Sequence, residues 1–332
     1  MTVIPAKLLL NWYACNGRDL PWRVKGGAHP NPYIVFVSEM MLQQTTVKTV
    51  IPYFERFMAR FPTVKDLAQA TEDEVFQYWQ GLGYYTRARS LLYTARKVIE
   101  KYNGYFPQNI KEIAALKGFG PYSAASFAAL AYNLPTTVID GNVQRIMCRM
   151  YRLTAPLEQI QSQIRAYAEV LIDKQNAADY ASAIMDLGAM ICTPKKPQCP
   201  LCPWQKICLC ANAADVEQIP QKSKPVKREV SGKVYIIANK KGEVYIRKRI
   251  EKGLLHGLYE FLWTEQGDLI KSATDSGLSV SHIFTHIKMM LEIMTVQIDT
   301  YDGDGIFVKP EELDIYPMST LMRKVRMKAL KK

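Results

Sequence analysis

The sequence predicts a mainly α-helical region over about residues 1–212, followed by a smaller α+β domain. Three observations support this division. Apolar residues recur at helical spacing through the first region, the segment Ile219–Pro225 is polar, basic and broken by two prolines, and short apolar runs separated by turn residues follow it. A chain of 332 residues is also long for a single hydrophobic core, so we expect two domains.

The first predicted helices have recognisable start and stop signals. Pro32 suits a first helical turn, and Ile34–Thr45 follows it as a mostly apolar helix. Thr71–Glu74 has the pattern of a capping box, which predicts a short helix that ends at Gly81.

Two further helices show one apolar and one polar face. Apolar residues recur at helical spacing over Leu91–Tyr102 until Asn103 and Gly104 end the helix. Asp140 is placed to cap a helix whose apolar stripe runs from Val143 to Tyr151. We interpret these stripes as core rather than as cofactor-binding faces.

The second domain combines a hairpin, more strands and a final helix. Turn residues at Asn239–Gly242 separate two apolar runs, which predicts a β-hairpin. The predicted elements are strands at Val234–Ile237, Val244–Ile246, Leu291–Ile298 and Ile306–Val308, and a basic helix at Leu321–Leu330.

Composition favours a polyanionic partner and a reducing compartment. The formal net charge is +12 and the pI is about 9.2, with the basic excess spread along the chain. No apolar run approaches the length of a membrane span, and the start has no signal-peptide pattern, so we expect a cytoplasmic protein. Cys15, Cys148 and Cys210 are then expected to be free thiols.

The other four cysteines predict a metal site. They are spaced Cys192-x6-Cys199-x2-Cys202-x5-Cys208, with no histidine within forty residues. Four thiolates suit either a zinc ion or an iron–sulfur cluster. A zinc site usually has two Cys-x2-Cys pairs and this segment has one, so the spacing favours a cluster without excluding zinc.

The segment Ile110–Ala131 predicts two helices joined by a KGFG turn. Gly118 and Gly120 would let the backbone approach a phosphate, and the start of the second helix offers N–H donors. An ordinary helix connection explains Gly-x-Gly equally well. Tyr122 and Ser123 follow the turn, where a side chain can face a bound substrate.

Two carboxyl groups suggest acid–base chemistry. Glu39 lies within an apolar helix, where burial would raise its pKa and keep a proton available near neutrality. Asp140 at a helix start would instead be held ionised by backbone donors. A surface glutamate and a simple helix cap are the alternatives. One neutral and one charged carboxyl group together suit cleavage of a glycosidic bond.

Several motifs together resemble one enzyme family. The segments SEMMLQQT, GLGYYTRAR, DGNV and MDLGAMIC and the four-cysteine spacing resemble the MutY-type adenine glycosylases, within the helix-hairpin-helix superfamily of endonuclease III. The resemblance covers essentially the whole chain and implies a 4Fe-4S cluster on Cys192, Cys199, Cys202 and Cys208. It implies a catalytic region 1–212, with a six-helix barrel and hairpin at about 24–134 and a cluster subdomain of 1–23 and 135–212, then a linker 213–230 and a Nudix-like domain 231–332.

The resemblance also implies residue roles. Glu39 would protonate adenine N7 and then assist the incoming water, Asp140 would stabilise the cationic sugar, and Asn142 would hold the site together. Tyr122 lies where bifunctional relatives have a Schiff-base lysine. Because only an amine forms the imine that leads to strand cleavage, we expect a monofunctional enzyme.

DNA contacts are expected on both sides of the catalytic residues. Gln44 and Tyr84 match residues that wedge into the base stack beside 8-oxoguanine, although Tyr84 also suits core packing. The remaining DNA-binding and lesion-binding candidates are Leu42, Arg87, Arg89, Gly118, Gly120, Lys195 and Lys196.

The second domain resembles the Nudix-like module with which this family recognises 8-oxoguanine. Arg247–Arg249 and Gly253–Phe261 carry the resemblance, but a catalytic Nudix box is absent, so we expect binding without hydrolysis. Phe284-Thr285-His286 matches a Phe-Ser-His loop with threonine in place of serine. Two other departures are Lys117, where proline is usual, and Ala125, where glycine is frequent.

The sequence therefore predicts a monomeric, bacterial, cytoplasmic glycosylase that removes adenine from A:8-oxoguanine or A:G mispairs in double-stranded DNA. An endonuclease III-like glycosylase and lyase is a first alternative, which Tyr122 and the second domain disfavour. A DNA-binding protein without catalysis is a second, which the coexistence of Glu39 and Asp140 disfavours. A nucleotide pyrophosphohydrolase would need the missing acidic box.

Overall fold

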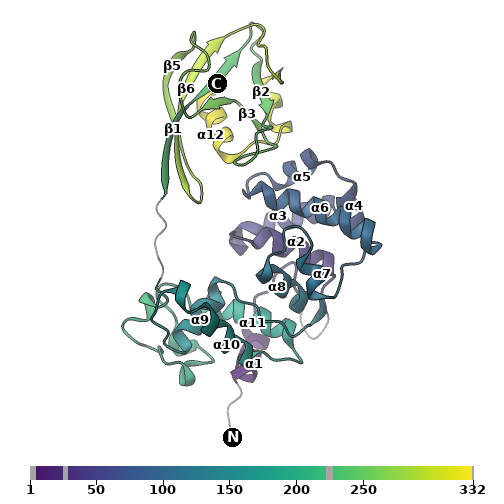
Figure 1. Cartoon of the computed structure of the whole chain (residues 1–332), viewed down its shortest axis with the longest axis vertical. Coiled ribbons are helices and arrows are strands. Elements are labelled where there is room, and N and C mark those ends of the chain that lie inside the picture. The colour runs from purple at the N-terminus through teal and green to yellow at the C-terminus, as the bar shows by residue number, and fades with distance from the viewer. Residues whose placement is uncertain (1–4, 25–28, 222–226, 331–332) are drawn as a thin grey trace. The chain divides into compact units, whose positions relative to one another are not determined.

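The computed structural model describes residues 5–24, 29–221 and 227–330. The described residues within 1–69 and 90–223 form one compact unit, and those within 70–89 and 224–332 form a second. Figure 1 shows the helices and strands with their labels. Each unit is described by itself. The predicted linker, 213–230, lies partly outside the described residues, at 222–226. The sequence did not predict that residues 70–89 belong to the same unit as the later part of the chain.

The first unit is helical, as the sequence predicts. Its α-helices are α1 (Pro5–Asn16), α2 (Pro32–Leu42), α3 (Val47–Arg60), α4 (Val64–Gln69), most of α6 (Tyr85–Tyr102), α7 (Ile110–Ala114), α8 (Pro121–Tyr132), α9 (Gly141–Met150), α10 (Gln161–Leu171) and α11 (Ala177–Met190). Short 3-10 turns occur at Leu157–Gln159, Cys199–Leu201, Gln205–Ile207 and Val216–Gln218.

Local signals explain where α2 begins and ends. Asn31 Oδ1 accepts a hydrogen bond from the Tyr33 N–H at 2.9 Å, and Pro32 fills the first helical position. The helix ends at Leu42 rather than at Thr45, because the backbone turns into the left-handed region at Gln44, with φ of 56°. The prediction was therefore right for the start of α2 and wrong for its end.

Helix α8 is the centre of the first unit. It packs against α2, α7 and α11, while α9 packs against α10 and α11 (Figure 1). Small residues make this possible: Ala124, Ala125, Ala128 and Ala129 of α8 are all buried. The packing brings the middle of α2 and the first turns of α8 and α9 to one place.

The cysteine-containing segment is attached to the helices by packing. Trp204 is 2% exposed, lies in the same hydrophobic core as α1, α9, α10 and α11, and donates its indole N–H to the Pro5 carbonyl at 2.8 Å. Burial of so large a side chain fixes the loop against α1.

The second unit contains a mixed sheet together with helix α5 (Glu72–Trp79) and the first turn of α6. Thr71 caps α5 by accepting the Glu74 N–H at 3.2 Å, as the capping pattern predicts. The strands are β1 (Arg228–Ala238), β2 (Val244–Lys248), β3 (Tyr259–Glu260), β4 (Leu262–Thr264), β5 (Thr274–Ile283), β6 (Ile287–Gln297) and β7 (Gly305–Val308). A 3-10 turn at Pro310–Ile315 precedes α12 (Thr320–Ala329).

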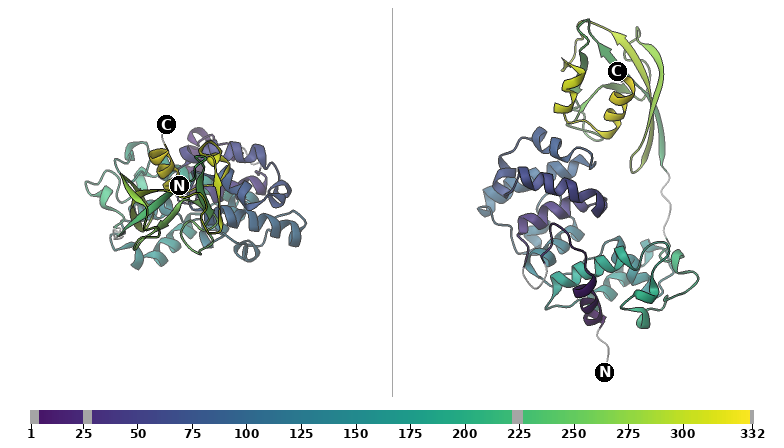
Figure 2. Two further views of the ribbon diagram at one scale, coloured as in Figure 1. Left: turned by 90° about the horizontal axis from the view of Figure 1, so that it is seen from above. Right: turned by 180° about the vertical axis from the view of Figure 1, so that it is seen from behind.

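The sheet has the order β3-β2-β1-β6-β5, with β4 paired to β1 and β7 to β2. Strands β1 and β6 run parallel from the Arg228↔Ile287 pair to the Ala238↔Gln297 pair, and β1 and β2 form the predicted hairpin. Residues of β1 alternate between two cores: Val234 packs on the face covered by α12, and Tyr235 on the opposite face. Figures 1 and 2 show α12 against the sheet from opposite sides.

The predicted fold class, a helical region followed by an α+β domain, is confirmed. The predicted strands at β6 and β7 and the final helix are also confirmed, whereas β3, β4 and β5 were not predicted. Among the described residues, no helix is long and apolar enough to span a membrane.

Candidate active site and nucleic-acid interface

A cavity of about 520 Å³ lies in the first unit where α2, α8, α9 and α11 meet. The four residues that the sequence selected as catalytic all line it: Glu39, Tyr122, Asp140 and Asn142. They come from three segments of the chain, so the fold places them together.

Glu39 is buried in the cavity wall, with 7% of its surface exposed. Burial raises the pKa of its carboxyl group to about 7, because the charged form loses its hydration; the Ser126 hydroxyl opposes the rise, Asp140 adds to it and Arg23 opposes it. A carboxyl group with this pKa holds a proton in about half of the molecules at pH 7. Glu39 therefore has the property that a general acid needs near neutrality.

Asp140 caps α9 and is fixed by two hydrogen bonds. Its Oδ1 accepts the Val143 N–H at 2.7 Å, and its Oδ2 accepts the side-chain amide of Asn142 at 2.8 Å. Asn142 in turn accepts a hydrogen bond from Arg145 Nη2 at 2.9 Å on its Oδ1. The carboxylate is thus held in one orientation with N–H donors around it.

Arg145 connects this carboxylate site to the cysteine loop. The side chain is 6% exposed, and it donates to the Cys192 carbonyl at 2.7 Å and to the Gly188 carbonyl at 2.8 Å. A Cβ atom added to Gly188 would lie 2.5 Å from the Cβ of Asn142. Only glycine allows α11 to approach the first turn of α9 this closely. Sequence reasoning did not select Arg145 or Gly188.

Tyr122 projects from the first turn of α8 and is half-buried. Its hydroxyl lies 3.9 Å from the sulfur of Met185. Burial raises its pKa well above the usual value, and the charges of Glu39 and Asp140 raise it further. The phenol therefore stays neutral. Of the described residues that line this cavity, Lys48 is the one lysine, and it is exposed at the start of α3.

The turn between α7 and α8 has the geometry that glycine permits. Gly118 has φ of +91°, and an added Cβ would meet Met40 at 2.6 Å and Ser90 at 2.9 Å. Gly120 caps α8, and a Cβ there would meet no described atom within 4 Å. The start of α8 is therefore open to a phosphate, and Gln43 links α2 to this turn by donating to the Gly118 carbonyl at 3.4 Å.

Comparisons with known proteins agree with this geometry. Residues 37–171 match the HhH-GPD superfamily of base excision DNA repair proteins, and residues 233–328 match the NUDIX domain. The adenine DNA glycosylase of Buchnera aphidicola subsp. Acyrthosiphon pisum is 32% identical, over 88% of this chain and 86% of the relative. The human adenine DNA glycosylase is 30% identical, over 96% of this chain and 72% of the relative. The chain belongs to the adenine DNA glycosylase family.

Solved structures support the fold of this adenine DNA glycosylase family member. A thermostable thymine-DNA glycosylase matches with a TM-score of 0.55 and 27% identity, over 62% of this chain and 94% of that one. A trapped endonuclease III–DNA intermediate matches with a TM-score of 0.51 and 21% identity, over 62% of this chain and 93% of that one. The second likeness concerns the fold alone.

The four predicted metal ligands lie in one neighbourhood of the first unit. The pKa of the Cys202 thiol is raised to about 12, mainly by burial and in smaller part by the other three thiols, which lie near it. Arg149, only 2% exposed, lies 3.5 Å from Cys192 Sγ, and Cys208 Sγ lies 3.6 Å from the Arg149 carbonyl.

The donor set of this loop is four neighbouring thiols, which are ligands suited to a zinc ion or an iron–sulfur cluster. In the part of the chain that the structure describes, no three His, Cys, Asp or Glu side chains converge as ligands for one metal ion. A 4Fe-4S cluster binds each of its four thiolates through a different iron, so its ligands surround a volume instead of meeting at a point. Cys192, Cys199, Cys202 and Cys208 are the residues of this loop that could hold such a group.

A second cavity, of about 390 Å³, lies within the second unit. The three residues of the predicted lesion loop, Phe284, Thr285 and His286, form the turn between β5 and β6, where the Phe284 N–H bonds the Ile287 carbonyl at 2.7 Å. Tyr84 lines the same cavity, and its hydroxyl lies 2.6 Å from Thr285 Oγ1. Residues that the sequence selected separately as wedge and lesion loop therefore share one cavity.

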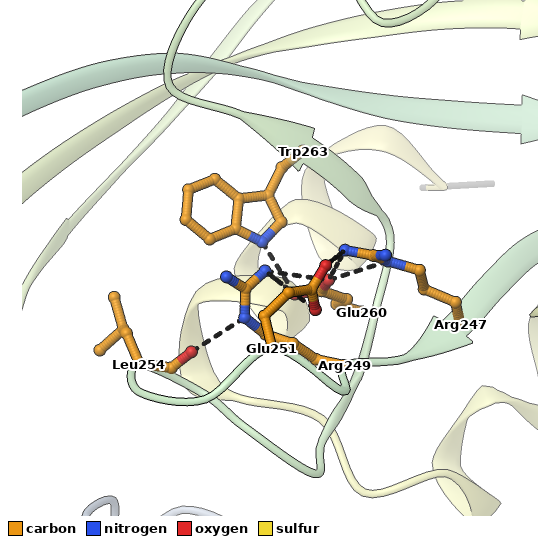
Figure 3. A network of polar contacts seen from close by, with 6 residues as sticks. All are labelled: Arg247, Arg249, Glu251, Leu254, Glu260 and Trp263. Atoms are coloured by element: carbon orange, nitrogen blue, oxygen red, sulfur yellow. Dashed lines mark hydrogen bonds and ion pairs between the residues drawn. The ribbon is translucent and has the colours of Figure 1, made fainter. Parts of the chain in front are cut away.

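A buried ion-pair network supports one wall of this second cavity (Figure 3). Glu260 is 1% exposed, and Arg247 and Arg249 reach its carboxylate from opposite sides at 2.9 and 3.2 Å. Trp263 donates its indole N–H to Glu260 at 2.8 Å, and Arg249 also donates to the Leu254 carbonyl at 3.0 Å. Glu260 thus fixes the loop that carries Leu254 into the cavity wall.

Arg87 does not have the setting expected for a phosphate contact. Its side chain is 7% exposed, and its Nη2 donates to the carbonyls of Leu82 and Gly83, both at 3.4 Å. Its guanidinium lies 5.0 Å from the ring centre of Tyr84. These contacts of Arg87 support the turn that carries Tyr84.

Arg89 is also engaged within the second unit. It pairs with Glu72 at 2.9 Å and donates to the His256 carbonyl at 3.0 Å. A Cβ added to Gly257 would lie 2.4 Å from the Arg89 guanidinium, so glycine at 257 admits this side chain. By contrast, Lys195 and Lys196 of the cysteine loop and Gln44 after α2 are exposed, while Leu42 is half-buried and lines the first cavity.

Two residues that line the first cavity, and one residue behind them, were missed because their signals are weak in sequence. Arg18 and Arg23 frame the segment RDLPWR, and Asp186 lies in MDLG, a motif that was recognised without assigning its aspartate. All three are linked by ion pairs in the structure. Asp186 is separated from both arginines by more than 160 residues along the chain.

Proposed function

We propose that this protein is a monofunctional DNA glycosylase that flips adenine out of double-stranded DNA and removes it by hydrolysis, in base excision repair. The substrate is adenine mispaired with 8-oxoguanine or guanine. The observation that carries the proposal is one cavity containing a buried Glu39 with a pKa of about 7 and an Asp140 fixed by two N–H donors. Membership of the adenine DNA glycosylase family supports it.

Each cavity residue has a role in this mechanism. Glu39 donates its proton to adenine N7 as the glycosidic bond breaks, then accepts a proton from the attacking water. Asp140 stabilises the positive charge that develops on the sugar. Asn142 orients Asp140 through the 2.8 Å hydrogen bond, and Tyr122 contacts the reacting sugar as a neutral phenol.

The absence of an amine at Tyr122 supports a reaction without strand cleavage. A lyase step requires a neutral amine that reaches the sugar C1′. Lys48 is the amine to consider as a rival nucleophile, because it lines the cavity, but it lies at the exposed start of α3.

The second cavity is the proposed site for the base opposite adenine. Tyr84 and the turn Phe284–His286 combine aromatic surface with hydroxyl and imidazole groups, which suits stacking and hydrogen bonding to a purine. Gln44, exposed on a left-handed backbone, is the second proposed wedge residue. The proposed backbone contacts are the turn at Gly118 and Gly120, and the exposed Lys195 and Lys196.

Cys192, Cys199, Cys202 and Cys208 are the proposed ligands of a 4Fe-4S cluster. When bound, the cluster would hold the loop in shape and present its lysines to DNA. The net charge of +12 supports DNA as the partner. We also propose that the protein acts as a monomer in the bacterial cytoplasm, and that 1–212, 213–230 and 231–332 serve as catalytic region, linker and lesion-recognition domain.

The test is single-turnover cleavage of duplexes with adenine opposite 8-oxoguanine, divided between samples with and without an alkaline step that breaks abasic sites. The proposal expects strand breaks only after alkali. A duplex with adenine opposite thymine is the matched control and should remain intact.

Breaks without alkali would replace the monofunctional proposal with a glycosylase and lyase, and Lys48→Ala would then show whether Lys48 is the nucleophile. Binding of the duplex with no adenine release under either condition would favour the non-enzymatic DNA-binding alternative.

A further inference from the structure

A buried carboxylate in the first unit holds two arginines of the active-site cavity. Asp186, on α11, is 0% exposed. Its Oδ1 accepts Arg18 Nε at 2.8 Å and Arg23 Nη2 at 2.9 Å, and its Oδ2 accepts the Arg18 backbone N–H at 2.9 Å and Arg23 Nη1 at 2.7 Å. Burial alone would raise the pKa of Asp186, but the hydrogen bonds and charges of Arg23 and Arg18 outweigh it and hold that pKa below its usual value.

The two arginines line the cavity, whereas Asp186 lies behind them. Arg18 and Arg23 are among the lining residues, with side chains 25% and 10% exposed, and the Asp186 side chain is fully covered. Two guanidinium groups and one carboxylate leave one net positive charge. That charge is part of the same wall as Glu39, whose pKa Arg23 lowers.

We propose that Asp186 is a positioning residue of the adenine cavity, which holds Arg18 and Arg23 side by side and limits the net charge of this three-residue cluster to one positive unit. The inference rests on the proposed function, because it concerns the protonation of Glu39 during adenine release. Without Asp186, the two cations would repel each other and would act on Glu39 with their full charge.

The groups around both carboxyls are few. Glu39 faces Ser126 and Tyr122 from α8, Asp140 from the segment before α9, and Arg23 from the segment after α1. Asp186 faces Arg18 and Arg23, and it lies near the Tyr13 hydroxyl of α1. Arg23 is the one group that acts on both carboxyls in these sets, so it transmits the charge state of Asp186 to Glu39.

The experiment compares two single variants and their double variant by the pH dependence of single-turnover adenine release, with the full-length protein. Asp186→Asn adds one net positive charge to the wall, Arg23→Gln removes one, and the double variant restores the original charge. Because a positive charge favours the ionised form of Glu39, the midpoint of the alkaline limb should move down by about half a pH unit in Asp186→Asn and up by a similar amount in Arg23→Gln. The double variant should return toward the wild-type midpoint.

The midpoint separates charge from structural damage where the folded fraction of the variant stays constant across the pH range, so stability is measured at each pH used. Thermal unfolding of each variant identifies the folded samples. If Asp186→Asn does not fold, Arg23→Gln still tests the inference, because it leaves Arg18 and Asp186 as a neutral pair.

Midpoints that stay together in folded variants, or that move in the same direction, would overturn the inference while leaving adenine release by the wild type intact. A wild-type profile with no alkaline limb near neutrality would instead count against Glu39 as the general acid. Failure of this inference is therefore distinguishable from failure of the proposed function.

Discussion

Replacing Glu39 by glutamine tests the central chemical proposal, because the amide keeps the shape of the side chain and cannot supply a proton. With a pKa of about 7, Glu39 is protonated in about half of the molecules at pH 7. At the ordinary value of 4.5, the protonated fraction would be about 0.3%. Burial therefore increases the population of the acid form about 150-fold at neutral pH.

We expect Glu39→Gln to lower the single-turnover rate of adenine release by about 10² to 10⁴, the usual contribution of a general acid. The wild-type rate should be highest below pH 7, reach half of its plateau near pH 7 and then fall about tenfold per pH unit. Duplex affinity, measured in parallel by fluorescence anisotropy, should change little. A variant that binds DNA and releases adenine at a near-normal rate would refute the role of Glu39.

The same substitution has a stability consequence with a definite sign. The pKa of Glu39 is raised on folding, so the folded state binds more protons than the unfolded state between about pH 4.5 and 7. Ionisation of buried Glu39 lowers the free energy of unfolding. This loss is absent below pH 4.5, grows between pH 4.5 and 7 and is complete above pH 7, where the rise of the pKa from 4.5 to about 7 corresponds to roughly 3 kcal/mol. Glu39→Gln should therefore be more stable than the wild type at pH 8, with the difference disappearing near pH 4.5. Denaturant unfolding at the two pH values measures it, and equal gains at both would contradict a buried, titrating carboxyl.

Three further substitutions test other parts of the structure. Thr285→Ala removes the hydroxyl that lies 2.6 Å from the Tyr84 hydroxyl in the second cavity, so the preference for 8-oxoguanine over guanine opposite adenine should fall several-fold. Thr285→Ser is the control, and equal losses of activity on the 8-oxoguanine and guanine duplexes would contradict this expectation. Gly188→Ala should lower stability by about 1–3 kcal/mol and slow adenine release, because the new Cβ would lie 2.5 Å from the Cβ of Asn142. The control is Gly141→Ala, whose new Cβ would meet no described atom within 4 Å, so stability and adenine release should stay unchanged. Glu260→Gln should cost about 3–5 kcal/mol in denaturant unfolding, because Arg247 and Arg249 lose their buried carboxylate and keep only the exposed Glu251 as an acidic partner. A loss below about 1 kcal/mol would show that the network is not cooperative.

The elements that sequence predicted well have local causes. The caps at Thr71 and Asp140 and the turn at Asn239–Gly242 depend on residues within a few positions of one another, and the structure contains all of them. The missed strand β5 has an irregular sequence of exposed and buried residues and a bulge between Asp275 and Leu278, so it lacks a period of two. Its pairing with β6 depends on tertiary structure.

The residues of the candidate site also divide into those that local sequence identified and those that it did not. Glu39 and Asp140 were identified because each lies in a motif whose local setting already suggests its protonation. Arg145 and Asp186 were not identified from sequence, because their function depends on partners far along the chain. Arg145 donates a hydrogen bond to the Cys192 carbonyl, and Asp186 accepts one from the Arg18 backbone N–H. An arginine or aspartate on a helix is usually solvent-exposed, so burial and pairing must be seen before a role can be assigned.

Backbone strain supplies evidence for the DNA-binding regions that does not depend on motifs. Among the described non-glycine residues with positive φ, three are asparagines, which tolerate this conformation, and the others are Gln44, Tyr84, Arg152, Lys196 and Leu255. Four of these five lie where the sequence independently suggested contact with DNA, the lesion or the cluster loop. A residue with a long side chain costs free energy in a left-handed backbone conformation, whereas glycine at the same position would not. Such strain persists mainly where the direction of a side chain matters for function. The proposed wedges Gln44 and Tyr84 have φ of 56° and 49° and are both exposed, so strain at these positions supports a role for the direction of their side chains.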